Sequence, residues 1–196
     1  DLDPNNLEIL INFSTNQIFL KKFENAKNIL NKILFINNMH LSALVNLGVV
    51  EYKLGNHIDA KKYFEKVLSV DENFAEAIFN LGVLQFKNEK FEKAKEFFNK
   101  TIRINPRHFE ALTNLAYIAQ KENNIEQAIS LNHLAIDLNP IEDTPYFNLA
   151  LINEDLNNID KSMHYYKKAI ELNPSKHDAK YNLARLHLYL HQYEEG

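Results

Sequence analysis

The 196-residue sequence predicts an all-α fold of stacked antiparallel helix pairs. Three observations support this prediction: apolar residues recur at steps of three and four, the pattern repeats about every 34 residues, and no insertion interrupts it. Steps of three and four place apolar side chains on one face of a helix, whereas a half-buried strand alternates with a period of two. A single helix pair cannot bury both of its apolar faces, so each pair needs neighbours.

The clearest unit covers residues 75–106. Its first helix is predicted from Ala75 to about Lys87, and its second helix follows a polar turn at Asn88–Lys90. Pro106 ends the second helix, because proline has no amide hydrogen and its ring clashes with the preceding turn. The unit is therefore expected to form a helical hairpin.

The same register continues along the chain, which predicts one domain over residues 1–196. Repeats are predicted to start at residues 7, 41, 75, 109 and 143, with a half repeat at 177. Each first helix carries a large residue followed by a small one: Phe13-Ser14, Leu47-Gly48, Leu81-Gly82, Leu115-Ala116, Leu149-Ala150 and Leu183-Ala184. Each complete second helix carries a small residue at one position: Ala26, Ala60, Ala94, Ala128 and Ser162. These small side chains are expected to let paired helices approach closely. Asn132 replaces an aromatic residue, which predicts a shallower contact there.

Both ends of the sequence are predicted to fall inside a repeat. Asp1–Pro4 fits the closing turn of a preceding unit, and Tyr193–Gly196 has the register of the start of a second helix. The helix predicted from His177 is too apolar for the polar outer face of a terminal capping repeat. We therefore expect a fragment of a longer solenoid, with end-to-end self-association through the exposed apolar faces.

With these positions in phase, the chain resembles the tetratricopeptide repeat (TPR) family over essentially its full length. The resemblance implies a right-handed α-solenoid, the TPR superhelix, whose first helices line a concave surface where ligands commonly lie. It also implies a protein-interaction scaffold. The basic clamp that chaperone-binding members use to hold a C-terminal carboxylate has no matching set of residues here, so C-terminal chaperone peptides are not expected as ligands.

An asparagine row follows the predicted first helices. The residue before the large one in every unit is asparagine: Asn12, Asn46, Asn80, Asn114, Asn148 and Asn182. A side-chain amide offers a donor and an acceptor together, which matches an extended peptide backbone. The row resembles the asparagine ladder in the TPR domain of O-linked N-acetylglucosamine transferase, which holds substrate polypeptide. We expect this row to bind an extended polypeptide segment; the alternative is family consensus shaped by local helix contacts.

Two further sets of residues flank the row. Aromatic side chains supply large, rigid contact area for a ligand, and four are expected to contact it: Phe79, Tyr117, Phe147 and Tyr181. Lysines recur near the ends of three first helices: Lys53, Lys87 and Lys121. These lysines either engage acidic ligand side chains or are placed there by the helix dipole, which favours cations at a C-terminus.

Composition narrows the function further. The net charge is −4, and charges of both signs are interspersed, so no basic footprint for nucleic acid is present. No apolar run approaches the roughly 20 residues that cross a bilayer, and no signal peptide is visible at Asp1. A cytoplasmic protein without membrane insertion is therefore expected. The absence of cysteine leaves the redox compartment open.

No catalytic residue, metal or cofactor is predicted. His187 and His191 lie four residues apart, with Glu194 and Glu195 nearby, but a zinc site needs further ligands at defined geometry. No glycine-rich phosphate loop and no nucleophile with a recognisable base occur in the sequence. Three functions remain: a scaffold that binds an extended polypeptide, a substrate-recruiting domain of a larger enzyme such as a glycosyltransferase, and a structural assembly element.

Overall fold

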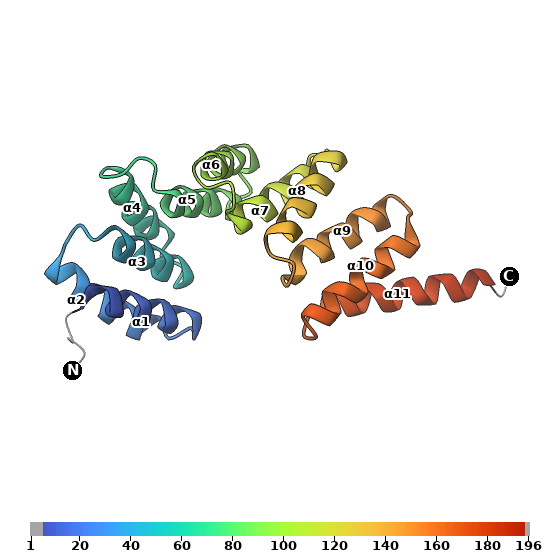
Figure 1. Cartoon of the computed structure of the whole chain (residues 1–196), viewed down its shortest axis with the longest axis horizontal. Helices are drawn as coiled ribbons and strands as arrows, with labels where there is room; N and C mark the ends of the chain where they lie inside the picture. Colours follow the sequence, from blue (N-terminus) through green and yellow to red (C-terminus); the bar gives the residue numbers. More distant parts are fainter. Residues whose placement is uncertain (1–5, 195–196) are drawn as a thin grey trace. The chain divides into compact units, whose positions relative to one another are not determined.

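The computed structural model describes residues 6–194, with the side chains of residues 6–190, and these residues form eleven helices and no strand (Figure 1). This confirms the all-α class and the pairwise packing of helices. The predicted closing turn at Asp1–Pro4 lies outside the described residues. The chain forms two compact units, residues 1–105 and residues 106–196, and one solenoid continuous across both stays a prediction.

Unit 1 contains three helix pairs, drawn from blue to green in Figure 1: α1 Leu7–Phe19 with α2 Phe23–Ile36, α3 Leu41–Lys53 with α4 His57–Leu68, and α5 Ala75–Lys87 with α6 Phe91–Ile104. The odd-numbered helices are the first helices of the repeats. Each pair packs internally, and α2 and α4 also contact the next first helix. The apolar core therefore continues from one pair to the next, as in the cluster that joins Leu44, Phe64 and Leu81.

Unit 2 contains two helix pairs and one further first helix: α7 Phe109–Lys121 with α8 Ile125–Leu138, α9 Asp143–Asp155 with α10 Ile159–Leu172, and α11 His177–Glu194. Pro145 lies in the first turn of α9, where a missing amide donor costs little. Its core includes Ala150, Tyr166 and Leu186, from three successive helices.

The first five first helices end in the same backbone motif. The second residue after each helix has a positive φ: Lys21, Gly55, Glu89, Asn123 and Asn157. In the first of these turns, the amide of Lys22 donates to the carbonyl oxygen of Gln17 and that of Lys21 to Ile18, a Schellman motif. The motif reverses the chain within three residues, which positions the second helix against the first.

Close contact within each pair depends on residue size at two facing positions. A Cβ atom added at Gly48 would lie 2.5 Å from the ring of Phe64, and one at Gly82 would lie 2.7 Å from that of Phe98. Both phenylalanines are fully buried. A methyl group at Gly48 or Gly82 would therefore force the facing phenylalanine ring to shift, whereas Ala116 and Ala150 occupy this position in unit 2.

Helix α11 begins at His177, where the half repeat was predicted to start, but it is longer than the other first helices. It has 18 residues, whereas α9 has 13, and it continues through the position where the earlier first helices turn. The expectation that Tyr193 starts a second helix is therefore wrong for this chain.

Candidate peptide-binding site

In unit 1, the asparagine row lies on three neighbouring first helices, because α1 contacts α3 and α3 contacts α5. Asn12 is exposed, and Asn46 and Asn80 are half-buried. The Nδ2 atom of Asn46 donates to Oγ1 of Thr15 across 3.2 Å, which links α3 to α1. Nδ2 of Asn80 donates to the carbonyl oxygen of Glu76 across 2.7 Å. Within residues 6–190, the amide oxygens of Asn46 and Asn80 accept no hydrogen bond.

A small cavity lies beside Asn46. It has a volume of about 210 Å³ and is lined by Ser42, Val45, Asn46, Phe74 and Glu76, from α3 and the start of α5. Sites for whole small molecules span roughly 300–1,000 Å³. This cavity is smaller and suits one side chain, with apolar walls and a polar rim next to an amide that can bond a backbone.

In unit 2, two members of the row are engaged by the preceding second helix. Asn148 is only 8% exposed, and its Nδ2 atom donates to Oδ1 of Asn132 on α8 across 3.2 Å. Asn182 on α11 donates to the hydroxyl oxygen of Tyr166 on α10 across 3.2 Å. Asn114 is half-buried. The structure therefore brings Asn148 and Asn182 into contacts inside unit 2, which sequence reasoning missed.

The residue type at one position of the second helix explains this difference. Asn132 and Tyr166 stand where the second helices of unit 1 carry Leu30, Phe64 and Phe98. Only a polar side chain at this position can form a hydrogen bond with the asparagine of the following first helix. Asn132 is fully buried and also donates to the carbonyl oxygen of Ala128, so the expected shallower contact is wrong. The polar substitution was visible in the sequence and was the available signal.

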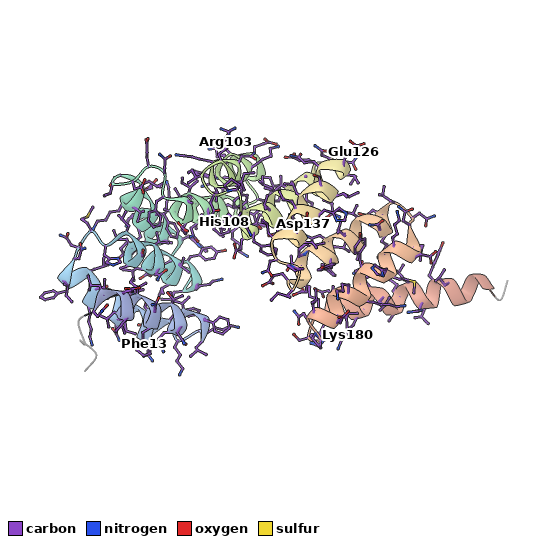
Figure 2. All side chains as sticks on the ribbon, in the orientation of Figure 1. Phe13, Arg103, His108, Glu126, Asp137 and Lys180 are labelled. Carbon is purple, nitrogen blue, oxygen red and sulfur yellow. The ribbon has the colours of Figure 1, made fainter. Side chains whose placement is uncertain are left out.

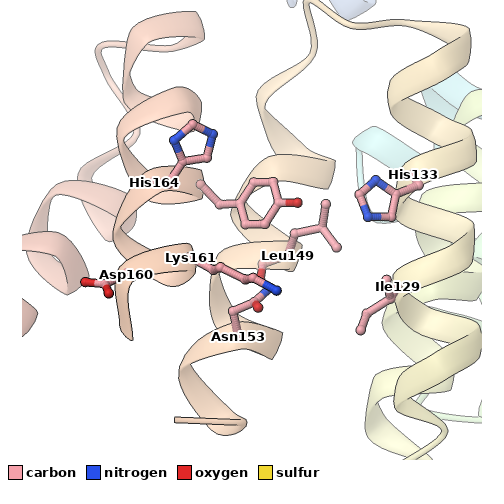
Figure 3. Close-up of a pocket in the computed structure, with 8 residues that line it drawn as sticks. Ile129, His133, Leu149, Asn153, Asp160, Lys161 and His164 are labelled. Atoms are coloured by element: carbon pink, nitrogen blue, oxygen red, sulfur yellow. The ribbon is translucent and has the colours of Figure 1, made fainter. Parts of the chain in front are cut away.

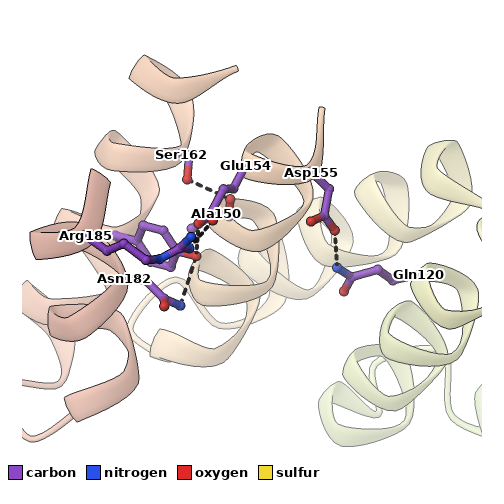
Figure 4. A network of polar contacts seen from close by, with 8 residues as sticks. Gln120, Ala150, Glu154, Asp155, Ser162, Asn182 and Arg185 are labelled. Carbon is purple, nitrogen blue, oxygen red and sulfur yellow. Dashed lines mark hydrogen bonds and ion pairs between the residues drawn. The ribbon is translucent and has the colours of Figure 1, made fainter. Parts of the chain in front are cut away.

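The hydroxyl of Tyr166 belongs to a polar network that joins α9, α10 and α11 (Figure 4). It donates to Oε2 of Glu154 across 2.9 Å, and Oε1 of Glu154 pairs with the guanidinium of Arg185. Burial, reinforced by the bond to Glu154, raises the pKa of Tyr166 well above its ordinary value. The bond to Glu154 likewise raises the pKa of Arg185. The ion pair between Arg185 and Glu154 links α11 to α9, and the bond from Asn182 to Tyr166 links α11 to α10.

The four aromatic candidates lie in different surroundings. The ring of Phe79 lies 5.6 Å from that of Phe98, and the ring of Phe147 lies 5.8 Å from that of Tyr166, so both pack within helix pairs. Tyr117 and Tyr181 are 36% and 70% exposed. Ligand contact by all four stays a prediction, and the two tyrosines have the most surface available.

All three lysines of the second row lie in the last turn of their helices, as the helix dipole favours. Lys53 lies over the ring of Tyr52 at 5.7 Å, and Lys121 lies over the ring of Tyr117 at 5.4 Å. Lys87 is exposed at the end of α5. Each lysine is thus accounted for locally, and its contact with a ligand stays a prediction.

Two other features bear on function. Among the described residues, no three histidine or acidic side chains are placed to hold a metal ion, and the side chain of His191 lies outside them. No described helix is both long and apolar enough to cross a membrane.

Comparison with protein families identifies repeats in most of the chain. Three tetratricopeptide repeat models match residues 39–107, 97–130 and 144–176. The matched segments include α3 to α7 and α10 in full. No curated protein sequence matches the chain.

Solved structures with the same fold cover almost the whole chain. YrrB, described as a TPR protein with an unusual peptide-binding site, is 20% identical, and the match covers 92% of this chain and 93% of YrrB with a TM-score of 0.61. MamA from Desulfovibrio magneticus is 20% identical over 90% of this chain and 99% of its own, with a TM-score of 0.64. A TPR protein of Thermus thermophilus is 17% identical over 93% of this chain and 99% of its own, with a TM-score of 0.74. At these identities the likeness establishes the fold.

Proposed function

Because this chain belongs to the tetratricopeptide repeat family, we propose that it is a protein-interaction scaffold whose unit 1 binds an extended polypeptide segment. The segment lies across α1, α3 and α5 on the face that carries Asn12, Asn46 and Asn80. The peptide-binding site named for YrrB supports a peptide as the class of ligand. Correspondence with the asparagine ladder of O-linked N-acetylglucosamine transferase and a cytoplasmic location stay predictions.

The observation that carries this proposal is the amide of Asn46 beside the 210 Å³ cavity. Its free oxygen accepts a backbone N–H of the ligand while the adjacent ligand side chain enters between Val45 and Phe74. Ser42 and Glu76 at the rim favour a ligand with a donor near this side chain.

The spacing of the row fits an extended chain. Neighbouring helices pack about 8–10 Å apart, and an extended chain advances about 3.3 Å per residue, so one asparagine meets roughly every third ligand residue. Each net hydrogen bond contributes about 0.5–1.5 kcal/mol. Several such bonds give an affinity that depends little on ligand sequence, and the cavity adds preference at one position.

Selection from a random-peptide display library tests the proposal. Peptides selected on the wild-type chain are measured against Asn46→Ala/Asn80→Ala, and we expect their affinity to fall about tenfold, from two lost bonds. The matched control is Asn25→Ala/Asn31→Ala, which removes two exposed amides from α2. Equal affinity for both double variants would place the binding surface elsewhere.

A specific observation favours self-association as a second function. Ile9 and Phe13 on α1 are 40% and 52% exposed, whereas Ala43 and Leu47, at the same positions of α3, are buried. Figure 2 labels Phe13 on α1. Tyr181 and Leu188 on α11 are also exposed. We propose that α1 of one copy packs on α11 of another. Because this head-to-tail contact leaves a free α1 and a free α11, sedimentation velocity should show concentration-dependent oligomers that Phe13→Asp abolishes. A wild-type chain that stays monomeric at high concentration would exclude this contact.

A further inference from the structure

A second cavity lies among α8, α9 and α10 of unit 2, on helices that the proposed peptide site does not use. Its volume is about 380 Å³, within the range of small-molecule sites. Ile129, Leu149 and Tyr165 supply apolar lining. The polar lining groups are those of His133, Asn153, Asp160, Lys161 and His164. Figure 3 shows these side chains contributed by three helices around one space.

The repeat register shows why this space is open. Three repeats earlier, the positions of Ile129 and Asn153 are held by Lys27 and Glu51. The Nζ atom of Lys27 lies 2.7 Å from Oε1 of Glu51, and Asn56 donates to Oε2 of Glu51 across 2.7 Å. An ion pair therefore spans α2 and α3 in unit 1. Ile129 and Asn153 are shorter and cannot pair in this way, which leaves the cavity in unit 2.

The charge of the cavity also differs from that of its counterpart. At the positions of Lys161 and His164, unit 1 carries Asp59 and Lys62, whose charged atoms lie 2.8 Å apart and neutralise each other. Lys161 makes no ion pair with any residue in the range 6–190. Figure 3 shows its side chain extending from α10 towards the α8 side of the cavity, whereas Asp160 points away. Lys161 is thus the one permanent cation in the lining, and Asp160, the one carboxylate there, makes no ion pair with it.

We propose that this cavity binds a small amphipathic carboxylic acid, with its apolar body against Ile129 and Leu149 and its carboxylate at Lys161. One lysine compensates one negative charge, so a monoanion is matched better than a phosphate dianion. The apolar lining removes the body of the ligand from water, which supplies most of the affinity. The carboxylate supplies orientation and discrimination against neutral analogues.

Titration calorimetry with 3-phenylpropionate and its neutral amide, 3-phenylpropanamide, tests this proposal on the full chain. The wild type should bind the acid about fivefold more tightly than the amide, the difference expected for a partly exposed ion pair. Lys161→Gln should abolish this preference. The control Lys167→Gln, at an exposed position of α10 outside the cavity, should retain it.

Two variants test whether the cavity itself is the site. Ile129→Lys/Asn153→Glu introduces the unit 1 ion pair into unit 2 and should abolish binding of both probes. His133→Trp places a large ring at the exposed α8 wall without altering the core, and should weaken both probes at least tenfold. Undetectable binding of either probe to the wild type, equal affinity for acid and amide, or unchanged binding to His133→Trp would overturn the proposal.

Discussion

The side-chain amide of Asn148 donates to Oδ1 of Asn132 across 3.2 Å, and both side chains are buried inside unit 2. The equivalent asparagine of unit 1, Asn80, donates only to the carbonyl oxygen of Glu76 in its own helix. The same residue at the same repeat position is therefore part of the core in one unit and of the surface in the other. This relationship separates the members of the row that are bonded within unit 2 from those that we propose to bind a ligand.

Asn148→Ala should lower the free energy of unfolding by about 1–3 kcal/mol, because it leaves the buried Oδ1 atom of Asn132 without its donor. Asn80→Ala should change stability by less than about 0.5 kcal/mol, since it removes a half-exposed side chain and alanine favours the helix. Urea unfolding of both variants checks this contrast. Equal destabilisation by the two substitutions would contradict the division.

Gly82→Ala should destabilise the chain by about 1–3 kcal/mol, because the added methyl group meets the buried ring of Phe98 at 2.7 Å. The matched double variant Gly82→Ala/Phe98→Leu should lose less than the two single losses combined, since the smaller side chain makes room. Thermal unfolding of the four proteins measures this coupling. Strict additivity would show that the ring and the glycine do not constrain each other.

Glu89→Gly should stabilise the chain by about 0.5–1 kcal/mol, because Glu89 has a φ of 56° that glycine adopts without strain. Asn123→Gly is the comparison, at a φ of 59°. Asn123→Gly should gain less stability, since asparagine tolerates the left-handed region better than glutamate does. Chemical denaturation of each variant against wild type tests this order, and a loss of stability in Glu89→Gly would contradict it.

The ion pair between Lys27 and Glu51 should make the free energy of unfolding depend on pH. Burial acts to raise the pKa of Glu51, but the bonds from Lys27 and Asn56 outweigh it and lower that pKa below its ordinary value of 4.5. The bond to Glu51 raises the pKa of Lys27 above 10.5. The pair is therefore fully charged between about pH 4.5 and 10.5.

Glu51→Gln should cost about 1–2 kcal/mol at pH 7. The carboxylate with a lowered pKa stabilises the folded state above its unfolded pKa, so the difference from wild type should shrink as pH falls below about 4.5. Unfolding free energies of the wild type and Glu51→Gln, measured at pH 7 and at pH 3, give the cost of the substitution and its change with pH. A difference that grows on acidification would contradict the assigned charge state.

The helix pairs were predictable because each rests on local signals: small residues at Gly48 and Ala60, and Pro106 after a helix. The partners of the asparagine row were harder to predict, because they depend on a second position sixteen residues earlier. The sequence of its own helix predicts only a weak contact for Asn132. Its role as acceptor for Asn148 depends on the packing of α9 against α8, which the sequence of one helix does not show. The cavity near Ile129 likewise follows from comparing two units in register, which no single motif reveals.

The most direct test of the peptide-binding account is to follow side-chain amide signals by NMR while a display-selected peptide is added to ¹⁵N-labelled protein. We expect the Nδ2 resonances of Asn46 and Asn80 to shift with peptide concentration, because their oxygens are available to the ligand backbone. The resonances of Asn148 and Asn182 should stay in place, because both amides are bonded within unit 2. Shifts confined to Asn148 and Asn182, or to neither pair during saturable binding, would contradict the assignment of the site to unit 1.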